Sequence, residues 1–175
     1  MLYNNFMEQK LSLFYQFDII LVCGLPGSGK SHFAKSYFNK DGRKRVNRNE
    51  IRKALYEMSN FGDSWREEYF NEKDESLVKH IERKSIEHIL FHKNKVLIDN
   101  TSVSMMSRKS YLSMAKELNK TIGLIFINTP LHKCIERNNS RPEHLSADII
   151  NKLYASIQPP SKLEGFKEIF IIDNY

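Results

Sequence analysis

The clearest chemical signal in the sequence is a complete G-x-x-x-x-G-K-[S/T] pattern near its start, formed by Gly24, Leu25, Pro26, Gly27, Ser28, Gly29, Lys30 and Ser31. Glycines let successive backbone N–H groups converge on a phosphate, and a helix beginning there adds partial positive charge. The Lys30 ammonium can reach the outer phosphates of a nucleotide, and the Ser31 hydroxyl can bind Mg²⁺. The pattern therefore predicts a nucleoside triphosphate site that uses Mg²⁺.

Two further groups of residues could act on the same nucleotide. Asp99 ends a buried apolar run and could act on Mg²⁺ through a water molecule, although a helix N-cap or turn residue would look the same. Arg137 and Arg141 lie four positions apart before Pro142. They could close over the triphosphate and stabilise charge on the transferred group, or they could be an exposed pair at a helix end.

Basic residues gather between positions 35 and 53, where Lys and Arg number eight and the acids number two. This window carries 8 − 2 = +6, which equals the formal charge of the whole chain. The residues are Lys35, Lys40, Arg43, Lys44, Arg45, Arg48, Arg52 and Lys53, against Asp41 and Glu50. A cluster of this kind favours a polyanionic partner such as nucleic acid, with a solvated Lys-rich face as the alternative.

The elements that position these residues alternate between strands and helices. Strands are predicted at 17–23, 43–47, 95–99, 121–128 and 168–173, with helices at 30–39, around 51–58, within 65–90, and at 104–118, 131–138 and 146–157. Such alternation predicts an α/β fold: a three-layer P-loop NTPase of the small-kinase type, with a mostly parallel five-stranded sheet and a helical lid at about 137–146. Residues 1–16 are expected to be an added arm of unknown role, and 17–175 a single domain.

Composition excludes several classes of protein. At 175 residues, with 41% hydrophobic and 27% charged residues, the chain is typical of one folded domain. No apolar run is long enough to cross a bilayer, the start does not resemble a secretory signal, and Cys23 and Cys134 make no disulfide framework. A cytoplasmic location without membrane association is expected. The aromatic residues Trp65, Tyr69 and Phe70 read as core, with a base-stacking surface as the alternative.

From about residue 17 to 157 the chain resembles the kinase domain of phage-type polynucleotide 5′-hydroxyl kinases, within the small P-loop kinases. The resemblance rests on the phosphate loop and on four further segments: Asn47-Arg48-Asn49-Glu50-Ile51-Arg52, Asp99-Asn100-Thr101-Ser102, Ile135 to Arg141, and Asp148 to Ile157. The Asn-Arg-x-x-x-Arg and Arg-Asn-x-x-Arg patterns, in this order, are more specific than the phosphate loop.

The resemblance implies a kinase that uses ATP and Mg²⁺ and has a nucleic acid with a 5′-hydroxyl end as its substrate. By this resemblance the phosphate loop, Arg137 and Arg141 bind the donor, and Ser31 and Asp99 serve the metal. Arg52 would hold the phosphate 3′ of the acceptor nucleoside. The rest of the acceptor site would be Arg48, Asn49, Asn100 and Thr101.

The sequence departs from the family pattern at two positions. Asn49 stands where the family has an aspartate that acts as general base, and an amide cannot accept the proton of a hydroxyl. The family's Ser-Asp pair is Asp99-Asn100 here, so that the acid has moved by one position. Glu50 or Asp99 could supply a carboxylate instead. The alternatives are a kinase of a small metabolite, nucleoside or modified base, and a regulatory protein that binds ATP and nucleic acid without turnover.

Overall fold

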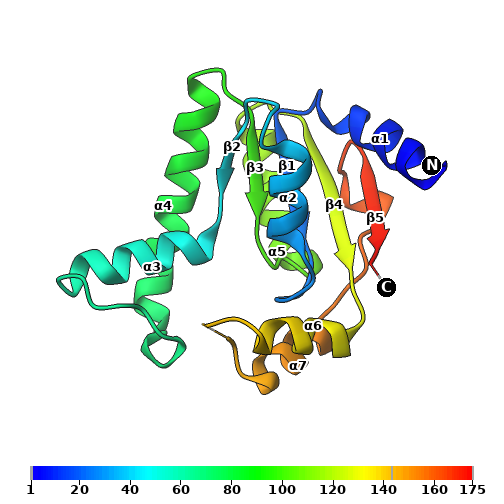
Figure 1. The fold of residues 1–175 in the computed structure, drawn as a ribbon. Helices are drawn as coiled ribbons and strands as arrows, with labels where there is room; N and C mark the ends of the chain where they lie inside the picture. The colour runs from blue at the N-terminus through cyan, green and yellow to red at the C-terminus, as the bar shows by residue number, and fades with distance from the viewer. Residues whose placement is uncertain (1, 143, 175) are drawn as a thin grey trace.

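The centre of the fold is a sheet of five strands, all parallel, and Figure 1 shows helices covering both of its faces. The computed structural model describes residues 2–142 and 144–174. The strand order is β2-β3-β1-β4-β5, with β1 in the middle. In chain order the strands are β1 (Ile19–Cys23), β2 (Lys44–Val46), β3 (Val96–Asp99), β4 (Ile122–Asn128) and β5 (Ile169–Asp173). The predicted α/β class and five-stranded sheet are confirmed.

Alternation along β1 explains the three layers, because successive strand residues point to opposite faces. Ile19 and Leu21 pack into the core beneath α4 and α5, whereas Ile20 and Val22 pack into the core beneath α1 and α2. All four side chains are fully buried. The helices that form the outer layers are α1 (Leu2–Phe14), α2 (Lys30–Phe38), α4 (Glu72–Phe91) and α5 (Met105–Glu117).

The amino-terminal segment belongs to this core. Met7, Leu11 and Phe14 lie on one face of α1 and are buried together with residues of α2 and β4. Gly123 leaves room for them, because a Cβ atom there would lie 2.6 Å from the Phe17 ring and 2.9 Å from that of Phe14. Of the arm expected at 1–16, residues 2–14 are therefore a packed helix; residue 1 lies outside the described part.

The remaining elements lie at one edge of the sheet or lead back to it. They are α3 (Arg48–Ser59), the 3₁₀ turn η1 (Glu67–Tyr69), α6 (Leu131–Asn139), α7 (Ala147–Ala155) and the 3₁₀ turn η2 (Lys162–Glu164). Where one or two helices were expected within 65–90, the structure has η1 and then the single long helix α4. No helix in the described ranges combines the length and the apolar character needed to cross a bilayer.

Because every strand is parallel, all the strands end at the same edge of the sheet. The register places Val22 beside Asp99, Cys23 beside Phe126, and Val46 beside Ile98. The phosphate loop follows β1 and α3 follows β2, so the predicted donor and acceptor segments begin at the same edge of the sheet, with β3 between them. Figure 1 shows α3 and α6 projecting on either side of this edge.

Candidate active site

The phosphate loop has the backbone that its glycines allow. Gly29 caps α2 with φ of 97°, and Gly27 has φ of 80°, both in the left-handed region that other residues rarely adopt. A Cβ atom on Gly27 would lie 2.1 Å from the backbone oxygen of Cys134 on α6. The loop therefore packs directly against the backbone of α6, and this contact helps to fix the loop conformation.

Lys30 is buried at the head of α2. Its Nζ donates a 2.6 Å hydrogen bond to the backbone oxygen of Leu25 across the loop. Burial lowers the pKa of Lys30 to about 8, with the nearby Asp99 acting in the opposite direction. The ammonium group is therefore still protonated at neutral pH, and a bound phosphate could replace the carbonyl as its partner.

Asp99 is fully buried at the end of β3, beside the strand that leads into the phosphate loop. Its Oδ2 accepts hydrogen bonds from Arg45 Nε at 3.0 Å and Nη2 at 2.7 Å. Its Oδ1 is buried and has no hydrogen-bond partner in the described part of the chain. An unpaired carboxylate oxygen at this position fits a water molecule on a bound Mg²⁺.

The residues present suit a metal that arrives with its nucleotide. Among the described residues no group of three His, Cys, Asp or Glu side chains could hold a metal ion by itself. Mg²⁺ is usually bound by one or two protein groups together with substrate phosphates and water. Ser31 and Asp99 would be those protein groups.

Arg45 is a site residue that the sequence patterns did not single out beyond its place in the basic window. In addition to Asp99, it binds Glu50, with Nη1 at 2.8 Å and 3.0 Å from the two carboxylate oxygens. It therefore joins the predicted metal-binding carboxylate to a carboxylate at the start of α3. Because Glu50 is largely exposed, its outer edge remains open to solvent.

Arg48 and Asn100, both predicted to bind the acceptor, take part in a buried polar network. Arg48 binds Glu82 of α4 through Nε at 3.0 Å and Nη2 at 2.6 Å, and the Tyr111 hydroxyl at 2.8 Å. The Asn100 amide donates to Glu82 and Tyr111, while its oxygen accepts from the Arg48 backbone N–H at 2.9 Å. Glu82, Asn100 and Tyr111 are buried, so this network fixes the start of α3 against β3.

The next turn of α3 presents Asn49 and Arg52. The Asn49 side-chain oxygen accepts a 2.9 Å hydrogen bond from Arg52 Nη1, and Arg52 also binds Glu75 of α4 at 2.7 Å and 3.0 Å. Thr101 contributes its backbone, because its carbonyl accepts from the Gly24 N–H at 2.9 Å. These bonds bring the predicted donor and acceptor segments together at one edge of the sheet.

Three arginines of the basic window pair with acids from elsewhere in the chain, which offsets 3 of its 6 excess positive charges. Arg45, Arg48 and Arg52 pair with Asp99, Glu82 and Glu75, and Arg43 pairs with Asp41 inside the protein. A count of charges over residues 35–53 leaves out Glu75, Glu82 and Asp99. These acids lie 23 to 54 positions along the chain from the arginines that they bind. In the argument for a polyanionic partner, the charges of Arg45, Arg48 and Arg52 are therefore already paired within the protein.

Arg137 and Arg141 lie on the other side of the phosphate loop. They line a cavity of about 600 Å³ together with Gly27, Gly29, residues of α1 and α2, and the ends of β4 and β5 with Asn174. This volume is within the range of small-ligand sites. The predicted lid thus borders the phosphate loop; its residue 143 lies outside the described part.

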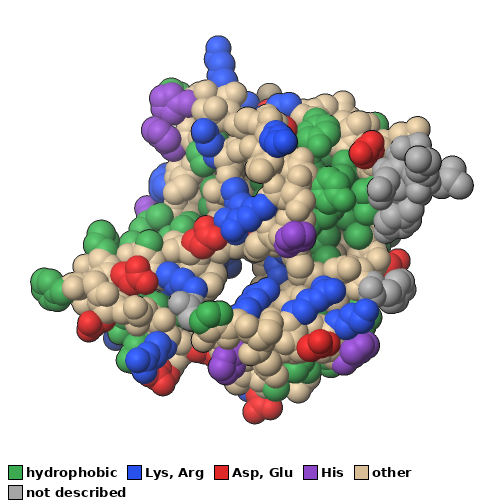
Figure 2. Space-filling model, viewed as in Figure 1, with side chains coloured by type: hydrophobic (Ala, Val, Ile, Leu, Met, Phe, Trp, Pro, Cys, Tyr) green, Lys and Arg blue, Asp and Glu red, His purple; other side chains and the backbone are tan. Residues whose placement is uncertain are grey.

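The lid also meets the acceptor side. The backbone N–H of Ser146 donates to Glu67 Oε2 of η1 at 3.2 Å. Figure 2 shows an opening between the projecting α3 region and the α6–α7 region, with Lys and Arg side chains along its rim. A substrate could approach the phosphate loop through this opening.

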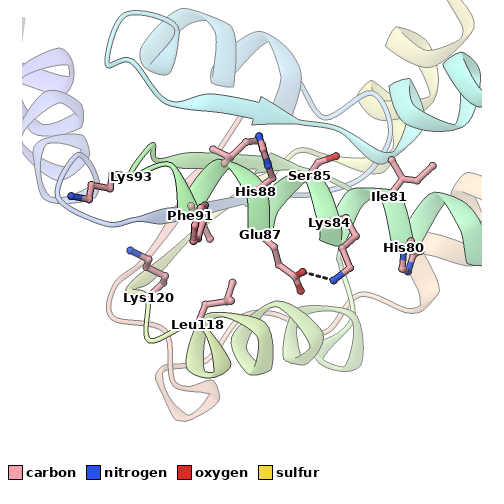
Figure 3. Close-up of a pocket in the computed structure, with 12 residues that line it drawn as sticks. His80, Ile81, Lys84, Ser85, Glu87, His88, Phe91, Lys93, Leu118 and Lys120 are labelled. Atoms are coloured by element: carbon pink, nitrogen blue, oxygen red, sulfur yellow. Dashed lines mark hydrogen bonds and ion pairs between the residues drawn. The ribbon is translucent and has the colours of Figure 1, made fainter.

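A second, larger groove lies away from this site. It measures about 1210 Å³ and is lined by the carboxyl-terminal half of α4, including the Lys84–Glu87 pair, and by Leu118 and Lys120 just after α5 (Figure 3). Because α4 ends just before β3 begins, the groove lies toward the opposite edge of the sheet. It contains no predicted site residue.

Comparison with known proteins agrees with this geometry. A family described as "AAA domain" (AAA_33) matches residues 19–160. The chain belongs to the AAA_33 family. Because the match runs from β1 past the end of α7, family membership covers the phosphate loop, the acceptor segment and the lid of this AAA_33 protein.

Two curated relatives are similar to this AAA_33 protein. An L-seryl-tRNA(Sec) kinase of Methanococcus maripaludis is 25% identical over 142 residues, or 81% of this chain and 53% of the relative. A putative bifunctional polynucleotide phosphatase/kinase of Acanthamoeba polyphaga mimivirus is 26% identical over 133 residues, or 75% of this chain and 26% of the relative. The chain thus spans about half of the first relative and a quarter of the second.

A solved structure of the Pnkp1/Rnl/Hen1 RNA repair complex contains a chain with the same fold. It matches with a TM-score of 0.64 and 23% identity, over 79% of this AAA_33 protein and 43% of that chain. At this identity the match supports the fold.

Proposed function

We propose that this protein is a kinase that transfers the γ-phosphate of ATP to a hydroxyl group of a nucleic acid, most simply the 5′-hydroxyl end of DNA or RNA. The observation that carries the proposal is that buried Asp99 lies close to Lys30 of the phosphate loop and is joined through Arg45 to Glu50 at the start of α3. A donor on one side and an acceptor on the other would meet there. The names of both curated relatives combine a kinase with a nucleic acid, a seryl-tRNA in one and a polynucleotide in the other.

The donor side would work through charge and position. Backbone N–H groups at the head of α2 and the Lys30 ammonium would hold the outer phosphates, while Arg137 and Arg141 would cover them from the lid. Mg²⁺, when bound, supplies positive charge to the phosphates. Ser31 and the free Oδ1 of Asp99 would hold it, directly and through water.

The acceptor side would orient a hydroxyl group. The Arg48 network fixes the first turn of α3, so that Asn49 and Arg52 face outward from a rigid base. Phosphoryl transfer has a loose transition state, so positioning and electrostatics supply most of the rate and a strong base is not essential. Asn49 can orient the hydroxyl, and Glu50, held by Arg45, is the nearest additional carboxylate on α3.

Transfer of labelled phosphate tests the proposal. Radiolabelled ATP and Mg²⁺ are incubated with single-stranded DNA and RNA oligonucleotides that end in a 5′-hydroxyl group, and with free nucleosides and sugars. Label is expected on the 5′-hydroxyl oligonucleotides, and 5′-phosphorylated copies of the same oligonucleotides should remain unlabelled. Absence of label from every nucleic acid in the panel would contradict the proposal.

The pairing of three acceptor-side arginines with carboxylates favours a second candidate, a kinase of a small metabolite, nucleoside or modified base. If the arginines remain paired when the acceptor binds, little positive charge is left for a polynucleotide. Salt distinguishes the two: the KM for a polynucleotide should rise steeply with ionic strength because counterions are released on binding, whereas the KM for a neutral small molecule should change little.

Asn49→Asp is expected to increase the transfer rate by about tenfold or more, because it places a general base at the position where an amide now stands. Initial rates at saturating ATP measure this, with Asn49→Ala as the matched control, which removes the amide without adding a base and should show no gain over the wild-type rate. If the wild-type protein binds ATP without turnover and only Asn49→Asp transfers phosphate, the protein is the base-deficient nucleotide-binding form. An Asn49→Asp rate at or below wild type would show that the missing base does not limit the reaction.

A further inference from the structure

One face of α3 leads away from the proposed transfer site. Asn49, Arg52 and Tyr56 are spaced three and four positions apart, so they lie along the same stripe of the helix. With a rise of about 1.5 Å per residue, Tyr56 lies about 10 Å further along the helix than Asn49. A chain whose end is held at Asn49 would pass this stripe.

Aromatic rings accompany the stripe. The Arg52 guanidinium carbon lies 5.5 Å from the centre of the Phe70 ring, which follows η1. The Tyr56 and Tyr69 rings are parallel within 3°, with their centres 5.0 Å apart. Phe70 and the Tyr56–Tyr69 pair, called here the aromatic surface, therefore form two flat contacts in sequence along α3.

The aromatic surface is accessible to solvent. Phe70 is 49% exposed and Tyr69 is 40% exposed, whereas Trp65 in the same segment is buried with 7% exposed. The reading of these three residues as core is thus right for Trp65 and wrong for Tyr69 and Phe70. The half-buried Tyr56 holds the Tyr69 ring parallel to its own, and Arg52 lies over Phe70, so the exposed rings of Tyr69 and Phe70 can accept another flat ring without further ordering.

Charge around the aromatic surface indicates which part of a nucleic acid it would contact. Residues 57–75 contain seven acids and two basic residues, so this lobe repels phosphates. Arg52 lies next to Phe70 on the side toward the transfer site, and its guanidinium is already paired with Glu75 at 2.7 Å. The surface therefore suits uncharged bases, and the phosphates of the same strand would be kept outside this lobe.

We propose that the aromatic surface stacks the first bases of a single-stranded acceptor, with the terminal base on Phe70 and the following base on the Tyr56–Tyr69 pair. Unpaired bases present both faces for stacking, and aromatic side chains accept any of the four bases. The inference rests on the proposed function and extends it to the kind of acceptor: an unpaired end, recognised without sequence preference.

A comparison of two acceptors tests the stacking directly. One is a single-stranded oligonucleotide with a 5′-hydroxyl end, and the other is identical but lacks its terminal base. The wild-type protein should prefer the intact acceptor in kcat/KM by about tenfold, the usual scale for one stacked base. Phe70→Leu should lose most of this preference by slowing only the intact acceptor. Phe61→Leu is the matched control, because Phe61 lies in the same loop and is fully exposed, and it should retain the preference.

A binding measurement separates this inference from the transfer reaction. Single strands carrying 2-aminopurine at the terminal position are titrated with protein, and stacking on an aromatic ring should quench the fluorescence. Quenching by wild type and Phe61→Leu but not by Phe70→Leu supports the inference, even if no label is transferred. Equal quenching by all three proteins, or equal use of the intact and base-free acceptors by wild type, would overturn it while leaving 5′-hydroxyl kinase activity unaffected.

Discussion

Lys30→Met is expected to lower the rate of phosphoryl transfer by about a thousandfold, a loss typical of removing one preorganised charge from a transition state. The Lys30 ammonium is buried at the phosphate loop, and among the described residues its hydrogen-bond partner is the backbone carbonyl of Leu25. Methionine retains the length and packing of the side chain but has no charge. The effect should fall mainly on kcat, measured with labelled ATP and the best acceptor of the panel.

The same variant, Lys30→Met, should be as stable as the wild-type protein or more stable, although its transfer rate falls. Burial disfavours the Lys30 ammonium, as its lowered pKa of about 8 shows, so an apolar side chain of similar size removes a desolvation cost. Thermal unfolding of Lys30→Met should therefore occur at or above the wild-type temperature. Lys35→Met is the matched control, since Lys35 is exposed on the same helix, and it should keep wild-type transfer. A Lys30→Met protein with more than a tenth of the wild-type rate would rule out the proposed role of the lysine.

Arg108→Met is expected to lower the free energy of unfolding by about 3–5 kcal/mol, because it leaves a buried carboxylate without its partner. Arg108 is fully buried on α5 and binds Glu164 of η2 through Nε and Nη2, each at 2.7 Å. Its Nη1 also donates to the backbone oxygen of Val103 at 2.9 Å. One guanidinium thus joins the loop after β3 to the segment that leads into β5.

Urea unfolding of three variants tests this assignment. Arg83→Met removes an arginine that binds two carboxylates at the surface, and it should cost less than about 1 kcal/mol. The double variant Arg108→Met/Glu164→Leu should recover most of the loss, because it leaves neither charge unpaired. If Arg108→Met and Arg83→Met lower the free energy of unfolding equally, the buried Arg108–Glu164 pair stabilises the fold no more than the surface pairs do.

The order of elements and the donor side of the site follow from local patterns. A continuous apolar run before Gly24 predicts β1, and the glycines and Lys30 specify the loop and the head of α2 within eight residues. Asp99 was found because an acid that ends a buried strand is a local feature. Such features can be predicted from the sequence because they depend on neighbouring residues alone.

The acceptor side depends on partners that folding brings from far along the chain. Arg48 and Arg52 stood out as basic residues, yet their carboxylate partners Glu82 and Glu75 lie on α4. A signal for Glu82 was present: it lies four positions from both Val78 and Ile86, in the middle of the buried stripe of α4. A charged residue in such a stripe needs a buried partner, but its identity depends on how α3 crosses α4. Arg45 gave no signal of this kind, because β2 has only three residues and its first two are partly exposed.

Gly27 occupies one of the positions that the G-x-x-x-x-G-K-[S/T] pattern leaves open to any residue. In this fold the position is closed, because its left-handed backbone and the Cys134 carbonyl 2.1 Å from a would-be Cβ exclude every side chain. The usual motif therefore understates how much of the loop is constrained. In a library that randomises residues 24–31, the variants that keep a nucleotide site would retain glycine at 27 as strictly as at 24 and 29, unless the backbone of α6 were redesigned together with the loop.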